Sequence, residues 1–150
     1  MALETLRKLF SRDLEKLKKE ISLYRDEQKI WHTEKEIPNS AGNLCLHLVG
    51  NLNAYIGAEL GHSGYVRNRE LEFSLKDIPR QELINKIEST LPIVDATLSQ
   101  LTEEQLAGDF PALVFKEKTS TEYMLIHLAT HLAYHLGQVN YHRRLLDSAG

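Results

Sequence analysis

Residues 3–31 read LETLRKLFSRDLEKLKKEISLYRDEQKIW, and their pattern decides the fold. Lysine, arginine and glutamate alternate with mostly apolar side chains that recur every three or four residues, as on one face of an amphipathic helix. That stripe runs through Leu6, Phe10, Leu14, Leu17, Ile21, Tyr24, Gln28 and Trp31. The sequence therefore predicts a long first helix over residues 3–31.

A second helix is predicted over residues 41–60. It follows a break at residues 36–42, which contain proline and glycine, and Asn39 or Ser40 can cap its start. Residues 62–78 then form a long connection that is rich in charged side chains.

Two more helices complete the pattern. Pro79 opens the third, with Asp77 as its cap, and Pro92 should kink that helix or move its start. Capping boxes predict a short turn at residues 102–105 and a last helix over residues 119–146.

Four long amphipathic helices without strand-like segments predict an all-α fold, a four-helix bundle formed by a single domain over residues 1–150. The long connection between the second and third helices suggests a crossover rather than a simple up-down-up-down order.

Composition excludes several classes of protein. A formal net charge of -3 without a concentrated basic face argues against nucleic-acid binding. No apolar run approaches the ~20 residues of a membrane helix, and no signal peptide is recognised. The single cysteine, Cys45, fits a reducing compartment, so the expected location is the cytoplasm.

Histidines concentrate in the last helix, where residues 126–138 read IHLATHLAYHLGQ. Side chains four residues apart lie one turn apart, so either His127 and His131 or His131 and His135 can share a metal ion. All three cannot, because His127 and His135 are separated by ~12 Å along the axis while a metal–nitrogen bond is ~2.0–2.1 Å.

Helical phase favours His131 and His135. They fall on the seam that faces other helices, which comprises Met124, Leu128, His131, His135, Gln138, His142 and Leu145. His47, in the apolar stripe of the second helix, is the best candidate for a third ligand. The alternative is that these histidines only bond to neighbouring polar groups. A zinc protease motif is excluded, because Leu132 stands where its glutamate would be.

Two segments resemble a known family. Leu44-Cys45-Leu46-His47-Leu48 and His131-Leu-Ala-Tyr-His135-Leu-Gly137-Gln138 resemble the DinB/YfiT-like superfamily of metal-dependent enzymes. Residues 51–73 resemble a branch known mainly as a domain of unknown function. The resemblance implies a bundle, often a homodimer, that binds nickel or zinc through His47, His131 and His135. It also implies thiol-dependent transferase or isomerase chemistry, with a thiol such as bacillithiol or mycothiol.

Two functions remain open. In the first, an ion with a free coordination position activates a thiol or water against a small-molecule substrate. Asn51 and Gln138 would then orient ligands or substrate, and Arg67 and Arg69 would bind an anionic substrate or else be solvated loop charges.

In the second, the protein is a non-catalytic stress-related or interaction bundle with a structural or vestigial ion. A fourth protein ligand would favour this structural role, and His142 and His62 are the candidates.

Overall fold

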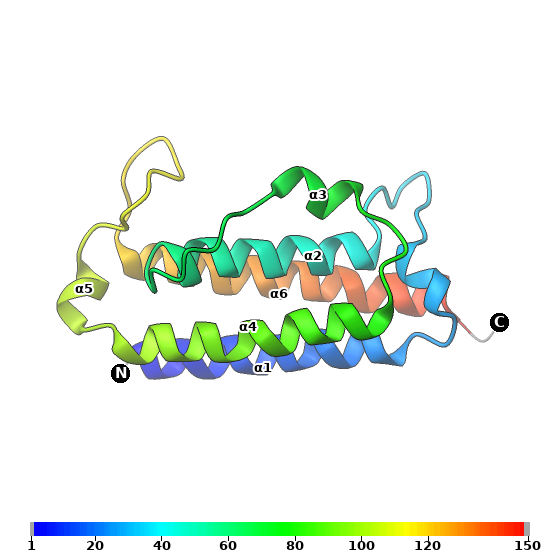
Figure 1. The fold of residues 1–150 in the computed structure, drawn as a ribbon, viewed down its shortest axis with the longest axis horizontal. Helices are drawn as coiled ribbons and strands as arrows, with labels where there is room; N and C mark the ends of the chain where they lie inside the picture. The colour runs from blue at the N-terminus through cyan, green and yellow to red at the C-terminus, as the bar shows by residue number, and fades with distance from the viewer. Residues whose placement is uncertain (1, 149–150) are drawn as a thin grey trace.

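The computed structural model describes residues 2–148 and confirms the all-α fold. Its four long helices pack side by side (Figure 1); they are α1 (Ala2–Leu23), α2 (Ala41–Leu52), α4 (Arg80–Gln100) and α6 (Thr121–Leu146). The shorter elements are the 3-10 helix η1 (Glu27–Trp31), the π-helix η2 (Asn53–Ala58), α3 (Arg69–Ser74) and α5 (Glu103–Ala107).

The predicted crossover is present. In Figure 1, α1 and α6 run in one direction and α2 and α4 run in the other. Because α2 and α4 are parallel, the chain between them must return along the length of the bundle. We call this segment, residues 61–78, the crossover. Helices α4 and α6 each contact both α1 and α2, so α1 lies diagonally opposite α2.

The core is formed by the predicted apolar stripes. In the stripe of the first segment every side chain except Gln28 is buried, and Phe10, Leu14 and Leu17 are almost completely inaccessible. Burying a side chain of this size contributes about 1.5–3 kcal/mol to folding, so this interface supplies much of the stability. No helix within residues 2–148 is long and apolar enough to cross a membrane.

The first helix is shorter than predicted. Helix α1 ends at Leu23, and residues 27–31 form the separate 3-10 helix η1. The backbone N–H groups of Arg25 and Asp26 donate to the carboxylate of Asp147, just after α6, at 2.6 and 3.2 Å. This contact from a distant segment satisfies the backbone where the chain leaves the helix.

The second helix begins as predicted but changes its winding. Ser40 is the cap, and its hydroxyl accepts from the N–H of Asn43 at 3.1 Å. The α-helix ends at Leu52 and continues as the π-helix η2, which ends at Ala58 rather than at residue 60. Such π segments are often found at functional sites.

The third helix differs from its prediction in two ways. Its first residue is Arg80, and Asp77 does not cap it but has a left-handed φ of 58°. Pro92 lies inside α4, which nevertheless runs from Arg80 to Gln100 as one helix.

The last two helices are close to their predictions. Thr102 and Gln105 form the predicted capping box of α5. Helix α6 starts at Thr121 with Ser120 as its cap, rather than at Thr119, and ends at Leu146 as predicted. The short helix α3, which Asn68 caps inside the crossover, was not predicted.

Candidate metal centre

The structure brings together the three histidines on which the metal prediction depends. His47 projects from α2, and His131 and His135 project from α6. One nitrogen of each ring lies within 4.8 Å of the others, and the Nε2 atoms of His47 and His131 are 3.2 Å apart. Two ligands of one tetrahedral ion, each bonded at ~2.0–2.1 Å, are separated by about 3.3 Å, so the geometry suits a shared ion.

His127 does not join this group. Its ring stacks on that of His131, with centroids 6.1 Å apart, and meets the ring of Phe115 edge-on at 5.0 Å. The choice between the two histidine pairs thus follows the helical phase.

The cluster favours uncharged imidazoles. Burial, together with the nearby charges of His135 and His47, lowers the pKa of His131 to about 4. Burial also lowers the pKa of His47, although the hydrogen bond to Glu72 opposes that shift. His131 and His47 are therefore neutral at pH 7, which is the form that binds a metal.

Two of the three rings are oriented by hydrogen bonds from Nδ1. The Nδ1–H of His135 donates to Oε1 of Gln138 at 2.6 Å, and that of His47 donates to Oε1 of Glu72 at 3.0 Å. A proton on Nδ1 leaves the Nε2 lone pair free, which is the usual arrangement of metal-binding histidines. These donors and their supporting partners fit a divalent transition metal ion.

Glu72 is the site residue that sequence reasoning missed. It lies on α3, is only 6% exposed and is surrounded in sequence by exposed charged residues, which hide its role. One signal was available: Gly50 lies inside the second helix, three residues after His47, and a glycine within a helix often has a packing or functional reason. A Cβ at Gly50 would collide with the Glu72 carboxylate.

A cavity of about 160 Å³ adjoins the histidines and is positively charged on one side. Arg67 is half-buried, forms a two-fold ion pair with Glu72 and lies over the Tyr55 ring at 5.7 Å. It is therefore not one of the solvated loop charges considered above. Arg69 is exposed at the same cavity. Its other lining residues include Asn51, His127 and Met124.

Two buried polar atoms at this cavity lack hydrogen-bond partners within the described part of the chain. They are Oδ1 of Asn51 and Nδ1 of His131. A buried polar atom without a partner costs roughly 1–3 kcal/mol, so its presence beside a cavity indicates a place for a ligand.

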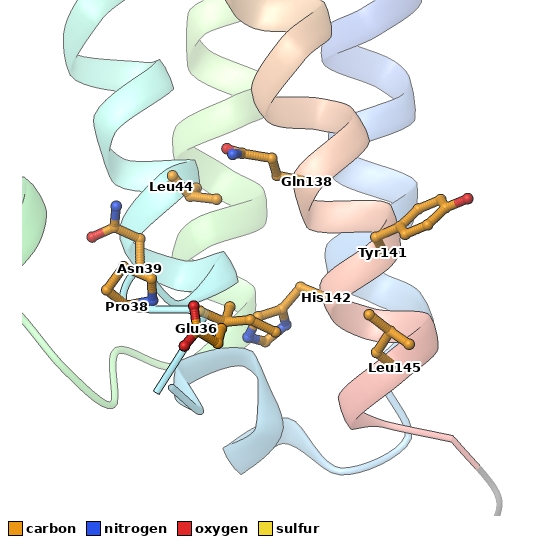
Figure 2. A pocket seen from close by; sticks show the side chains of 9 residues that line it. Glu36, Pro38, Asn39, Leu44, Gln138, Tyr141, His142 and Leu145 are labelled. Atoms are coloured by element: carbon orange, nitrogen blue, oxygen red, sulfur yellow. The ribbon is translucent and has the colours of Figure 1, made fainter. Parts of the chain in front are cut away.

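A second cavity, of about 340 Å³, is lined by residues that follow His135 on α6 and precede His47 on α2, so it lies on the other side of the cluster along the bundle. Figure 2 shows this cavity from close by. Leu44, Tyr141 and Leu145 contribute apolar surface, together with Ile37 and Pro38. Gln138, which holds His135, also lines this cavity, and Figure 2 shows its amide pointing toward Leu44. The histidine cluster thus lies between a cationic and a mainly apolar cavity.

The two candidate fourth ligands lie elsewhere. Nδ1 of His142 accepts from the Tyr24 hydroxyl at 2.6 Å, and its Nε2–H donates to the carbonyl of His32 at 2.8 Å. Both nitrogens of His142 are thus used to join α6 to Tyr24, just after α1, and to His32, just after η1. His62 is exposed in the crossover with a left-handed φ of 54°. Within residues 2–148 the cluster therefore contains three candidate ligands.

Comparison with known proteins agrees with the fold. The crystal structure of a conserved protein from Enterococcus faecalis superposes with a TM-score of 0.76 over 95% of each chain, at 15% sequence identity. This likeness shows a common fold. Curated proteins give no significant match. The family model described as protein of unknown function (DUF1572) matches residues 2–149, and the chain therefore belongs to that family.

Proposed function

We propose that the protein is a metal-dependent enzyme with a divalent ion, nickel or zinc. It would join an anionic small-molecule thiol to an electrophilic partner, or use that thiol to isomerise a substrate. The observation that carries this proposal is the meeting of His47, His131 and His135 beside a cavity with two arginines. The resemblance of the histidine motifs to the DinB/YfiT-like superfamily supports the thiol chemistry.

An ion held by three imidazoles supplies an open position that lowers the pKa of a thiol or water bound there. The chain's own residues then orient the substrate. Arg69, which is exposed at the cavity, attracts a carboxylate, and Arg67 is fixed beside it between Glu72 and Tyr55. Oδ1 of Asn51 accepts a hydrogen bond from the substrate, which explains why it has no partner among the described residues.

The second cavity accommodates the apolar part of the electrophilic partner. Its wall is mostly apolar, and it reaches the cluster through Gln138. A thiol in the cationic cavity and an electrophile in the apolar one would meet at the histidines. With water instead of a thiol, the same arrangement would support hydrolysis.

A structural ion is the competing role. A structural transition-metal site usually has four protein ligands, whereas a catalytic site has three and an exchangeable position. The three-ligand cluster among the described residues favours chemistry.

Metal content tests this proposal directly. The purified protein, grown in medium that contains nickel and zinc, should carry about one ion per chain by elemental analysis, and the His131→Ala and His135→Ala variants should carry almost none. His127→Ala is the matched control, because it removes a neighbouring imidazole outside the cluster, and it should retain the ion. A metal-free, folded wild type would refute the metal site.

Turnover tests the reaction class. The metal-loaded protein should consume bacillithiol or mycothiol in the presence of an electrophile, and an apo protein should not. If the ion binds but neither thiol transfer nor hydrolysis occurs, the non-catalytic role is the better account.

We also propose that the protein forms a homodimer in the cytoplasm. Helix α6 carries large exposed apolar side chains on one face, namely Tyr123, Ile126, Tyr134, Tyr141 and Leu145. A second copy that covered this face would remove apolar surface from water. Light scattering should give twice the chain mass, and Tyr134→Glu together with Tyr141→Glu should yield monomers.

A further inference from the structure

The crossover is fixed to α2 by contacts that involve no candidate metal ligand. The side-chain N–H groups of Asn43 donate to the backbone carbonyls of Glu72 and Leu75 at 2.9 and 2.8 Å. Opposite the Glu72 carboxylate, Gly50 leaves the space that any larger residue would fill. Both ends of Glu72, its backbone and its carboxylate, are therefore held against α2.

The carboxylate of Glu72 has two partners. Arg67 donates from Nε to Oε2 at 2.8 Å and from Nη2 to Oε1 at 3.0 Å, and His47 Nδ1 lies 3.0 Å from the same Oε1. An ionised carboxylate cannot donate, so the proton of this last contact must be on Nδ1 of His47. Nη2 of Arg67 also lies 3.3 Å from that nitrogen, because both groups approach one oxygen.

We propose that Glu72 is a positioning residue, which fixes His47 in the Nδ1–H form with Nε2 facing His131 and thereby couples docking of the crossover to metal binding. This inference rests on the proposed metal site. Carboxylates that accept from a metal-binding histidine orient the ring and increase its basicity.

The coupling has a direction. An ion on Nε2 withdraws electrons from the ring, so Nδ1–H becomes a stronger donor to Glu72 and the crossover is held more tightly. The crossover also carries Arg67 and Arg69, so an ion that tightened its docking would also hold these arginines more firmly at the cavity. By linkage, docking of the crossover would strengthen metal binding by the same factor by which the ion strengthens docking.

Zinc binding to Glu72→Gln provides the main test, with Zn²⁺ as the probe in a chelator competition assay. Glutamine keeps the size and one acceptor but loses the charge, so the affinity should fall about 10–100-fold. The Gly50→Ala variant, which displaces the carboxylate without removing it, should also bind more weakly. Glu34→Gln is the matched control, since it alters an exposed contact of 2.7 Å between Glu34 and His32, and should not change the affinity. Wild-type affinity in Glu72→Gln would overturn the proposal.

Hydrogen exchange tests the coupling to the crossover. Zn²⁺ should slow exchange of the amides of residues 67–75 in the wild type, and this protection should be reduced in Glu72→Gln. Equal protection in both proteins would refute the coupling.

A third measurement does not require the metal. Long-range proton–nitrogen NMR spectra of the metal-free wild type should show His47 protonated at Nδ1, and an Nε2–H form would overturn the role of Glu72. If zinc does not bind but His47 is in the Nδ1–H form, the proposed function fails while the positioning role of Glu72 stands.

Discussion

The Nε2 atoms of His47 and His131 lie 3.2 Å apart, although 84 residues separate these histidines in the chain. In the metal-free protein the contact is a hydrogen bond from one ring to the lone pair of the other. Because Nδ1–H of His47 donates to Glu72, His131 must supply the proton, which leaves its own buried Nδ1 as an acceptor without a partner within residues 2–148. Binding of an ion at both Nε2 atoms would require this proton to move to Nδ1 of His131, which frees the Nε2 lone pair.

Acid should destabilise the metal-free protein through His131. Its pKa is about 4 when folded and about 6.5 when unfolded, so below pH 6.5 the unfolded chain binds more protons. The stabilising contribution is complete above pH 6.5 and is lost as the pH falls from 6.5 to 4, by up to about 3 kcal/mol. Urea unfolding at a series of pH values measures this loss. The His131→Gln variant should lose less free energy of unfolding over this pH range. An equal loss would mean that other groups cause the pH dependence.

Replacing Asn51 by leucine should stabilise the metal-free protein. Oδ1 of Asn51 is buried without a partner among residues 2–148, and an apolar side chain of similar size removes its cost of about 1 kcal/mol. The zinc content should not change, while turnover should fall because the substrate loses an acceptor. If Asn51→Leu has a lower free energy of unfolding in urea than the wild type, the Asn51 amide is hydrogen-bonded in the folded protein and the prediction is wrong.

Arg69→Ala should weaken binding of a dicarboxylate such as succinate to the zinc-loaded protein. Arg69 is exposed at the cationic cavity, so we expect a loss of about five-fold that shrinks as salt is added. Titration calorimetry at two salt concentrations measures it. Arg25→Ala, which removes an exposed charge just beyond the end of α1, is the control and should leave succinate binding unchanged.

Tyr24→Phe should destabilise the end of the bundle. The hydroxyl of Tyr24 donates to Nδ1 of His142 at 2.6 Å, and both residues are buried. Phenylalanine leaves that nitrogen without a donor, which costs about 1–3 kcal/mol. Thermal unfolding should show the decrease, and the zinc content should be unaffected because His142 lies outside the cluster. Loss of zinc would mean that the cluster depends on this end of the bundle.

Gly137→Ala should stabilise α6. Gly137 is exposed within the helix, and a Cβ there meets no atom within 4 Å. Alanine loses less backbone entropy on folding, so the gain should be about 0.5–1 kcal/mol. The melting temperature measured in the monomeric Tyr134→Glu/Tyr141→Glu background tests this gain, and a decrease there would contradict the prediction. The same change at Gly50 should be destabilising, because its Cβ meets Glu72.

The sequence by itself determined the bundle and part of the candidate site. Helical periodicity is local, so it identifies the long helices, their apolar faces and the shared face of His131 and His135. The length of residues 61–78 was enough to suggest the crossover. His47 could be chosen because it lies in the apolar stripe of another helix.

Only the tertiary structure decided which polar side chains turn inward. Glu72 lies among exposed charges in sequence, but Asn43, Gly50 and Arg67 hold it against His47. His142 shares the seam of His131 and His135, yet Tyr24 and the backbone of His32 occupy both its nitrogens. These outcomes depend on partners distant in sequence, and a repeating pattern along one helix contains no information about them.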